Sequence, residues 1–170
     1  MDENEKQEEE IVEIDVTETS TNGELKTENE RNPSVFSMEE LIQEMLAENF
    51  SDIPLAIMGD FNIAPKAEDV SNPEAMQNKV SFHPEEHALL AKLTDFGMCD
   101  LFRKFDPRSG QFSWWDFRTQ GFERGEGMRI DFILANTVLT SSCQACIIDT
   151  EAREQDRPSD HAPVIGEFSL

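Results

Sequence analysis

The chain has 170 residues and a formal net charge of −22 at pH 7, from 36 acidic and 14 basic side chains. This length allows one domain with its own core. The charge argues against nonspecific affinity for DNA, which needs a basic surface, although local fields matter more than the sum. Residues 1–40 hold 14 acidic and 3 basic side chains, so this short segment carries a net −11, half of the total.

Other classes of protein are excluded by what the chain lacks. No apolar run approaches the ~18 residues of a membrane span, and the acidic N-terminus does not resemble a targeting signal. The three cysteines are an odd number, and the C-x-x-C pair at Cys143 and Cys146 has no second pair to complete a zinc site. We therefore expect free thiols, a cytoplasmic location as in a bacterial cytosol, and no membrane partner.

The predicted elements begin after a polar leader. Residues 1–34 are too poor in apolar side chains to offset their ordering entropy, which predicts a disordered acidic segment. The sequence Ser37-Met38-Glu39-Glu40 has the pattern of a capping box and predicts the start of an amphipathic helix. The apolar run at 54–60 then predicts a buried strand that ends on a carboxylate.

Helix and strand patterns alternate further along the chain. Residues 63–82 are expected to form a loop, and the periodicity of residues 84–96, followed by Gly97, predicts an amphipathic helix. Four apolar segments predict strands: 112–117, 129–134, a short one that begins at 147, and 163–168. His83 and His87 flank the start of the predicted helix and are expected at the surface.

The first candidate site residues are Asp60 and Asn62, which follow the predicted strand at 54–60. The period of two along a strand places both side chains on one side of the chain and Phe61 on the other. A carboxylate and a carboxamide are hard oxygen ligands that suit magnesium, and the amide can also donate to a phosphoryl oxygen. The alternative is an ordinary turn, because Gly, Asp and Asn are common turn residues.

Asp131 is a single charge inside the apolar strand predicted at 129–134. An ionised carboxylate is costly there unless it is paired or hydrogen-bonded. Asp131 either bonds Arg129 or a loop amide, or it polarises a partner in a cleft.

Asp160 and His161 precede the last predicted strand, and Trp114 and Trp115 lie next to Arg118. His161 can carry a proton near neutral pH or bind a phosphate when charged, while Asp160 can orient it or bind a metal. Aromatic rings beside a guanidinium can stack on a sugar or base while the cation holds a phosphate. Because adjacent residues of a strand face opposite ways, we expect one tryptophan in the core and one exposed.

Taken together, four segments resemble the exonuclease III family of the endonuclease/exonuclease/phosphatase superfamily in their order and spacing. The segments are Ile57–Pro65, Phe112–Arg118, Arg129–Asp131 and Ser159–Val164. The resemblance covers about residues 37–170. The first and last segments would also suit inositol-phosphate phosphatases or sphingomyelinases, whereas the tryptophan segment and its distance from Asp131 favour the DNA-repair branch.

This resemblance implies an α/β fold that is part of a four-layer αββα sandwich of the DNase I type. It also implies Mg2+ (or Mn2+)-dependent hydrolysis on the 5′ side of abasic sites and at 3′ termini of duplex DNA. The resemblance implies that Asp60 is the acid/base and metal-linked carboxylate and that Asn62 stabilises the charged phosphorane and contacts the metal. It also implies that Asp131 is a supporting catalytic carboxylate, that Asp160 is a metal ligand and that His161 contacts the phosphate. Trp114 and Met128 match positions that wall the sugar pocket, and Arg118 is expected to contact DNA.

The chain departs from the family pattern in its first part. Family members carry an Asn, a metal-binding Glu and a catalytic Tyr in their N-terminal half, but this chain contains no tyrosine and residues 1–36 show no such motif. We therefore expect residues 35–170 to form the C-terminal half of the domain, with one apolar sheet face exposed. Three readings stay open: a nuclease completed by a separate chain, a truncated inactive relative, and an interaction protein.

Overall fold

The structure is a computed structural model that describes Glu40, Gln43 and residues 52–169. The leader predicted at 1–34 and most of the helix predicted from Ser37 lie outside the described residues. Among the described residues, no helix is long and apolar enough to cross a membrane. All three cysteines are free thiols, as expected.

A three-stranded antiparallel sheet forms the centre of the described part, in the order β1-β3-β2. Its strands are β1 (Ala56–Asp60), β2 (Cys99–Asp100) and β3 (Asp131–Ala135). One face packs against α3 (Pro84–Asp95) through a buried cluster that joins Ile57, Phe132 and Leu134 of the sheet to Leu90 and Leu93 of the helix. The predicted strand at 54–60 and helix at 84–96 are thereby confirmed, with the helix followed by Gly97 at φ +106°.

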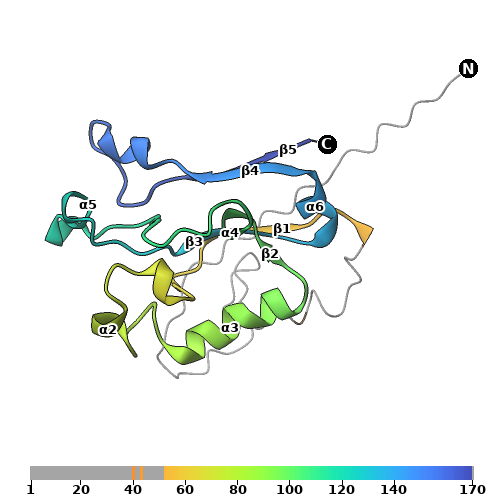
Figure 1. Ribbon diagram of the computed structural model, residues 1–170, viewed down its shortest axis with the longest axis horizontal. Helices are drawn as coiled ribbons and strands as arrows, with labels where there is room; N and C mark the ends of the chain where they lie inside the picture. The colour runs from red at the N-terminus through yellow and green to blue at the C-terminus, as the bar shows by residue number, and fades with distance from the viewer. Residues whose placement is uncertain (1–39, 41–42, 44–51, 170) are drawn as a thin grey trace, which may run out of the picture.

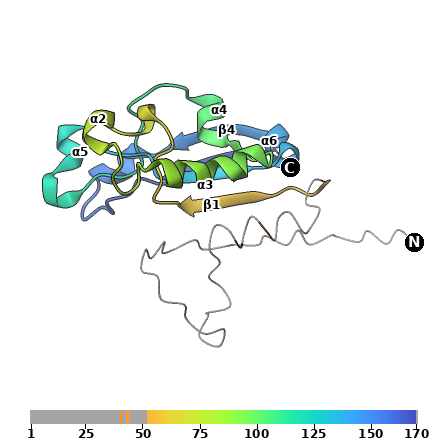
Figure 2. The same ribbon diagram turned by 90° about the horizontal axis from the view of Figure 1, so that it is seen from below.

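A second sheet lies over the other face of the first (Figures 1 and 2). It consists of the antiparallel pair β4 (Cys143–Ile148) and β5 (Val164–Phe168). Ile133 and Ala135 of β3 share a buried cluster with Cys143 and Cys146 of β4, and Phe102 of α4 (Leu101–Phe105) completes it. The described residues thus form a helix layer and two facing sheets, three of the layers that an αββα sandwich contains.

Shorter elements connect these layers. They are η2 (Ala67–Asp69), α2 (Pro73–Met76), η3 (Phe117–Thr119), α5 (Gly121–Arg124), α6 (Thr137–Ser142) and η4 (Thr150–Glu154). The loop predicted at 63–82 therefore contains two short helices, each held by local hydrogen bonds such as the one that Asn72 accepts from the N–H of Ala75.

The strand predicted at 112–117 is wrong. Within these residues Trp114 alone makes isolated bridges, to Met128 on one side and to His161 on the other, and η3 begins at Phe117. This short segment nevertheless ties the start of β3 to the loop that precedes β5, and so it brings the candidate site together.

Three further expectations need correction. Ile148 ends β4 rather than beginning a strand. Strand β1 is not buried throughout, because Met58 is 49% exposed at the open edge of the sheet. His83 and His87 are half-buried rather than at the surface: His83 caps α3, and His87 packs edge-on against Phe82.

Two exposed apolar side chains lie on the second sheet. Ile147 and Ile165 are paired across β4 and β5 and are 53% and 40% exposed. Other residues of these strands, such as Cys146 and Val164, pack against β3 and α4. The exposed sheet face expected from a missing first half stays a prediction.

Candidate active site

The register of the central sheet places two carboxylates opposite one another. Asp60 ends β1, Asp131 begins β3, and the two are direct antiparallel partners. Paired residues on one face of a sheet lie within side-chain contact distance. Two residues 71 positions apart in sequence are therefore neighbours because of strand pairing alone.

His161 lies between these carboxylates. Its Nδ1 is 3.1 and 3.0 Å from the two carboxylate oxygens of Asp131, and its Nε2 is 4.0 Å from Oδ2 of Asp60. Asp131 therefore bonds the histidine rather than Arg129, which decides between the alternatives left open by the sequence. With Asp131 accepting a hydrogen bond from Nδ1–H, the opposite ring nitrogen faces Asp60.

The electrostatics of the cluster raise the pKa of both His161 and Asp60. The hydrogen bond from His161 to Asp131, opposed by burial, raises the pKa of the imidazole. Burial, together with the nearby Asp131 charge, raises the pKa of Asp60, although the hydrogen bonds from Asn62 act against this. Both shifts favour a proton within the cluster.

The raised pKa of His161 predicts a pH-dependent stability. The folded state binds this proton more tightly, so the stabilisation is complete below the unfolded pKa of ~6.5 and is lost as pH rises through the higher folded pKa. We expect the free energy of unfolding from urea titrations to fall as the pH rises above about 6.5. His161→Gln should flatten this slope, whereas His87→Gln should keep it; an unchanged slope in His161→Gln would contradict the assignment.

Asn62 holds Asp60 through a tight turn. Its backbone N–H donates to Oδ1 of Asp60 at 2.8 Å, and its side-chain amide donates to Oδ2 at 3.1 Å. Asn62 has a left-handed backbone with φ 52°, a conformation that asparagine tolerates better than most residues. The two interpretations of Asp60 and Asn62, as a turn and as site residues, are thus compatible. The turn brings the Asn62 amide into contact with the Asp60 carboxylate.

Asp160 is fixed by the tryptophan segment rather than by His161. The indole Nε1–H of Trp114 donates to Oδ2 of Asp160 at 3.1 Å, and the N–H of Trp115 donates to the Asp160 carbonyl at 3.1 Å. Trp115 is 5% exposed and Trp114 is half-buried, close to the expected division between core and surface.

Ser113 is a buried residue that links parts of the candidate site and that the sequence analysis missed. It is fully buried, and its hydroxyl oxygen accepts the N–H groups of Ile130 and Asp131 at 3.0 and 3.1 Å. Its carbonyl also accepts the N–H of Ala162 at 2.7 Å. One serine thus links the backbone that carries Asp131 to the backbone beside His161, and no signal in a Phe-Ser-Trp-Trp run would have identified it.

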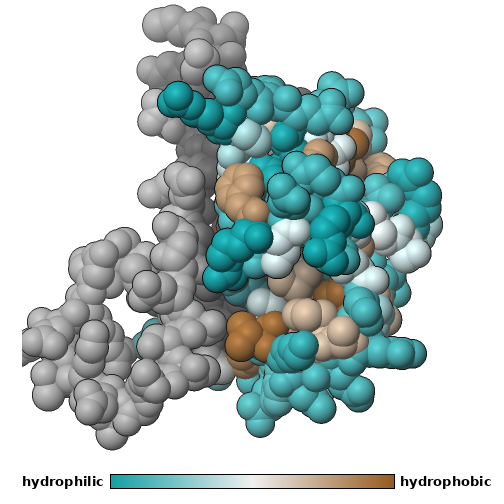
Figure 3. All heavy atoms as spheres, turned by 90° about the vertical axis from the view of Figure 1, so that its left-hand side faces the viewer, coloured by the Kyte–Doolittle hydropathy of each residue, from teal (hydrophilic) through white to brown (hydrophobic). Residues whose placement is uncertain are grey.

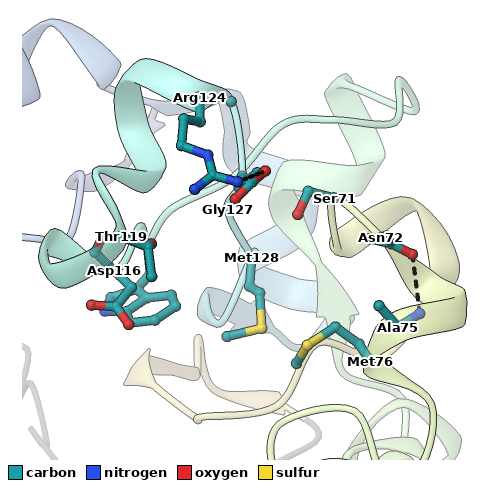
Figure 4. A pocket seen from close by; sticks show the side chains of 12 residues that line it. Ser71, Asn72, Ala75, Met76, Asp116, Thr119, Arg124, Gly127 and Met128 are labelled. Atoms are coloured by element: carbon teal, nitrogen blue, oxygen red, sulfur yellow. Dashed lines mark hydrogen bonds and ion pairs between the residues drawn. The ribbon is translucent and has the colours of Figure 1, made fainter.

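A hollow of about 640 Å3 adjoins this cluster through Trp114. Met76 and Met128 point toward one another across it, with Arg124 above them (Figure 4). At the end of the molecule that carries α2 and α5, hydrophilic side chains surround smaller apolar patches (Figure 3). Met128 therefore lies beside Trp114, as expected, and its backbone is hydrogen-bonded to that of Trp114 in both directions.

Arg118 is not joined to the cluster. Its guanidinium donates to both carboxylate oxygens of Asp116 at 3.0 and 2.9 Å, and its side chain is 88% exposed. Among the described residues, no group of three or more His, Cys, Asp or Glu side chains is arranged to hold a metal ion. The oxygen donors present are those of Asp60, Asn62 and Asp160.

Residues 11–161 match the sequence model of the Endonuclease/Exonuclease/phosphatase family. The chain belongs to this family. A similar protein of this family is exodeoxyribonuclease III of Haemophilus influenzae, which is 38% identical over 136 residues; the match covers 76% of this chain and 51% of that protein. The chain spans about half the length of the curated relatives it matches.

Solved structures of family members share the fold. An AP endonuclease from Archaeoglobus fulgidus superimposes with a TM-score of 0.74 at 32% identity, covering 78% of this chain and 52% of that one. The 3′ phosphatase NExo from Neisseria, solved with a product DNA hairpin, gives a TM-score of 0.70 at 34% identity, with coverage of 78% and 50%. These likenesses establish the expected DNase I-like α/β fold for this family member.

Proposed function

We propose that this chain carries half of the active site of a DNA-repair nuclease of exonuclease III type. The reaction is magnesium-dependent hydrolysis of phosphodiester bonds at abasic sites and 3′ termini of duplex DNA. The observation that carries the proposal is the arrangement of His161, held by Asp131 at 3.0 Å and facing Asp60 at 4.0 Å. Nuclease relatives and a DNA-bound structural neighbour support DNA as the substrate.

In this proposal, His161 binds the scissile phosphate in its charged form. Asp131 fixes the ring and stabilises the imidazolium, and the raised pKa of His161 keeps it protonated closer to neutral pH. Asp60, whose pKa burial also raises, exchanges a proton with the attacking water or the leaving oxygen. Asn62 orients Asp60 and keeps one amide hydrogen for a phosphoryl oxygen.

The donor set fits a divalent cation in part. Mg2+ binds proteins through one or two carboxylates and completes its shell with water and substrate phosphate. Asp60, Asn62 and Asp160 would hold it, with Oδ2 of Asp160 already accepting the Trp114 indole N–H at 3.1 Å. Bound there, the cation would supply Lewis acidity and neutralise phosphate charge.

The hollow beside Trp114 suits a sugar that has lost its base. Trp114 and Met128 would form an apolar wall against the deoxyribose. Arg118 is paired with Asp116, but its exposed side chain would reach the DNA backbone. Residues 35–170 would be the C-terminal half of the nuclease domain and residues 1–34 an acidic leader. A separate chain is a candidate source of the remaining half.

The test is nicking of a duplex that contains one abasic site, with the full chain and each variant purified identically. Cleavage is expected in MgCl2 and not in EDTA. Asp60→Asn and His161→Ala should each lower the rate by at least about 10²-fold, the scale of a lost acid–base group. Asp156→Asn removes one exposed carboxylate from the loop before His161 and serves as the matched control.

The outcomes separate the alternatives. Equal nicking by wild type and Asp60→Asn would indicate a contaminant and contradict the proposed site. If no form of the chain nicks, binding of the same duplex measured by fluorescence anisotropy distinguishes a binding protein from a chain without DNA affinity. Activity restored by a second chain would support the proposal that the site is shared.

A further inference from the structure

Arg153 is a buried cation that the proposed chemistry does not use. It lies on η4, its side chain is 7% exposed, and its Nε and Nη1 atoms are buried without a hydrogen-bond partner. None of the ion pairs found among the described residues includes Arg153. Burying a charge without a counterion is unfavourable, so its presence requires another explanation.

The partners of Arg153 are three aromatic rings. Its guanidinium carbon lies 4.8 Å from the centre of the Phe117 ring, 5.2 Å from Phe122 and 5.9 Å from Trp115. Trp115 and Phe122 are themselves perpendicular, with centres 5.0 Å apart. A planar cation among ring faces is attracted by their quadrupoles, and its orientation is fixed by their geometry.

The ring cluster is connected to the candidate active site through the tryptophan segment. Trp115 donates its backbone N–H to the carbonyl of Asp160, and the adjacent Trp114 donates its indole N–H to the Asp160 carboxylate, both at 3.1 Å. Arg153 and Asp160 lie in the same connection between β4 and β5. The connection between β4 and β5 therefore contacts the tryptophan segment at two points. Arg153 packs on the Trp115 ring near the start of the connection, and Asp160 accepts hydrogen bonds from Trp114 and Trp115 near its end.

We propose that Arg153 is a positioning residue that holds the connection carrying Asp160 and His161 against the tryptophan segment. An apolar side chain would fill the same space without the cost of burying charge, but it would lack the directional attraction of the guanidinium for three ring faces. The proposal deepens the proposed function, on which its kinetic part rests. Its structural part concerns the Trp114–Asp160 hydrogen bond and does not depend on cleavage.

The test uses the two indole N–H groups, because the chain contains only Trp114 and Trp115. Hydrogen exchange of both is followed by NMR in the full chain, and Trp114→Phe assigns the signals. Arg153→Met keeps the length of the side chain and removes the cation. It is expected to accelerate exchange of the Trp114 indole about tenfold, because local opening frees that hydrogen.

A second variant keeps the proposal testable if Arg153→Met does not fold. Phe117 is 53% exposed, so Phe117→Ala removes the nearest ring face with little loss of core, and we expect about threefold faster exchange. Arg157→Met, an exposed arginine in the same connection, and Phe105→Ala, another exposed phenylalanine, are the matched controls and should match wild type. Wild-type exchange of the Trp114 indole in the folded Arg153→Met or Phe117→Ala variant overturns the proposal.

The kinetic part of the test measures whether the loss of Arg153 also slows DNA cleavage. If the chain cleaves DNA, Arg153→Met should lower kcat about tenfold and leave KM within about twofold, because a displaced group affects the reaction more than binding. A chain that never cleaves would contradict the proposed function and leave the exchange result standing. A lowered kcat with unchanged indole exchange would overturn the positioning role.

Discussion

Asp131→Asn is expected to lower the rate of DNA cleavage by about 10²- to 10⁴-fold while the chain stays folded. Both carboxylate oxygens of Asp131 lie within 3.1 Å of Nδ1 of His161, so the carboxylate fixes the ring and stabilises its charged form. An asparagine in its place carries no charge to stabilise the imidazolium, and only one of its two side-chain atoms can accept the Nδ1–H, since the other donates. The charged histidine would then lose its stabilising carboxylate, and its tautomer would no longer be fixed by an acceptor on both sides.

Single-turnover nicking of an abasic duplex measures this effect apart from product release. The loss is expected in the rate of the chemical step, with DNA affinity within about threefold of wild type, because in the proposed mechanism Asp131 acts through His161. Asp156→Asn removes the same charge from the exposed surface and should cleave like wild type. Full activity of Asp131→Asn would mean that His161 acts without the carboxylate, and the proposed roles would have to be reassigned.

The strands that carry these residues were predictable because each is an apolar run interrupted or ended by a carboxylate. The pairing of β1 with β3 was not, since it joins residues 71 positions apart and depends on packing against α3. Residues 112–117 failed as a strand for a related reason. Their aromatic content is typical of strands, but among them Trp114 alone makes bridges, one to Met128 and one to His161, so no ladder extends.

The sequence was enough to predict which residues form the candidate site, but not all of the contacts between them. Asp60, Asn62, Asp131 and His161 do come together, and Trp114 contacts Asp160. Ser113 and Arg153 were missed because each contacts backbone atoms or aromatic rings that are far away in sequence. Arg118 was predicted from its place beside two tryptophans, but it pairs locally with Asp116.

Arg129 is another residue whose contacts could not be predicted from the sequence. Among the substitutions proposed for stability, its replacement should cause the largest loss in the free energy of unfolding. It is 1% exposed, its Nε donates to Oδ1 of Asp69 at 2.7 Å, and its Nη2 lies 2.8 Å from Oδ2 of Asp100. Burial opposes its charge, but Asp100 and Asp69 outweigh this and raise the pKa of the guanidinium. Arg103 shares the same oxygen of Asp69, which is itself fully buried.

Arg129→Met should therefore lower the free energy of unfolding by about 3–5 kcal/mol, because it leaves the Asp69 charge buried with one partner fewer. Urea denaturation measures the loss. Arg124→Met is the matched control: Arg124 pairs with Glu126 at 2.7 Å, but both side chains are about half exposed, so the cost should stay within about 1 kcal/mol. Equal losses in the two variants would show that burial of the Asp69 network contributes little.

A double-mutant cycle decides whether the loss comes from the unpaired charge or from the missing side chain. Asp69→Asn removes the buried charge, and its carbonyl can still accept from Arg103. If the charge dominates, Arg129→Met should cost less in the Asp69→Asn background, by about 0.5–3 kcal/mol. The same network holds the start of β3, since Arg129 N–H donates to the Asp69 carbonyl at 2.8 Å, two residues before Asp131. Strong coupling would therefore mean that a buried ion-pair network fixes the start of β3, and with it the position of Asp131.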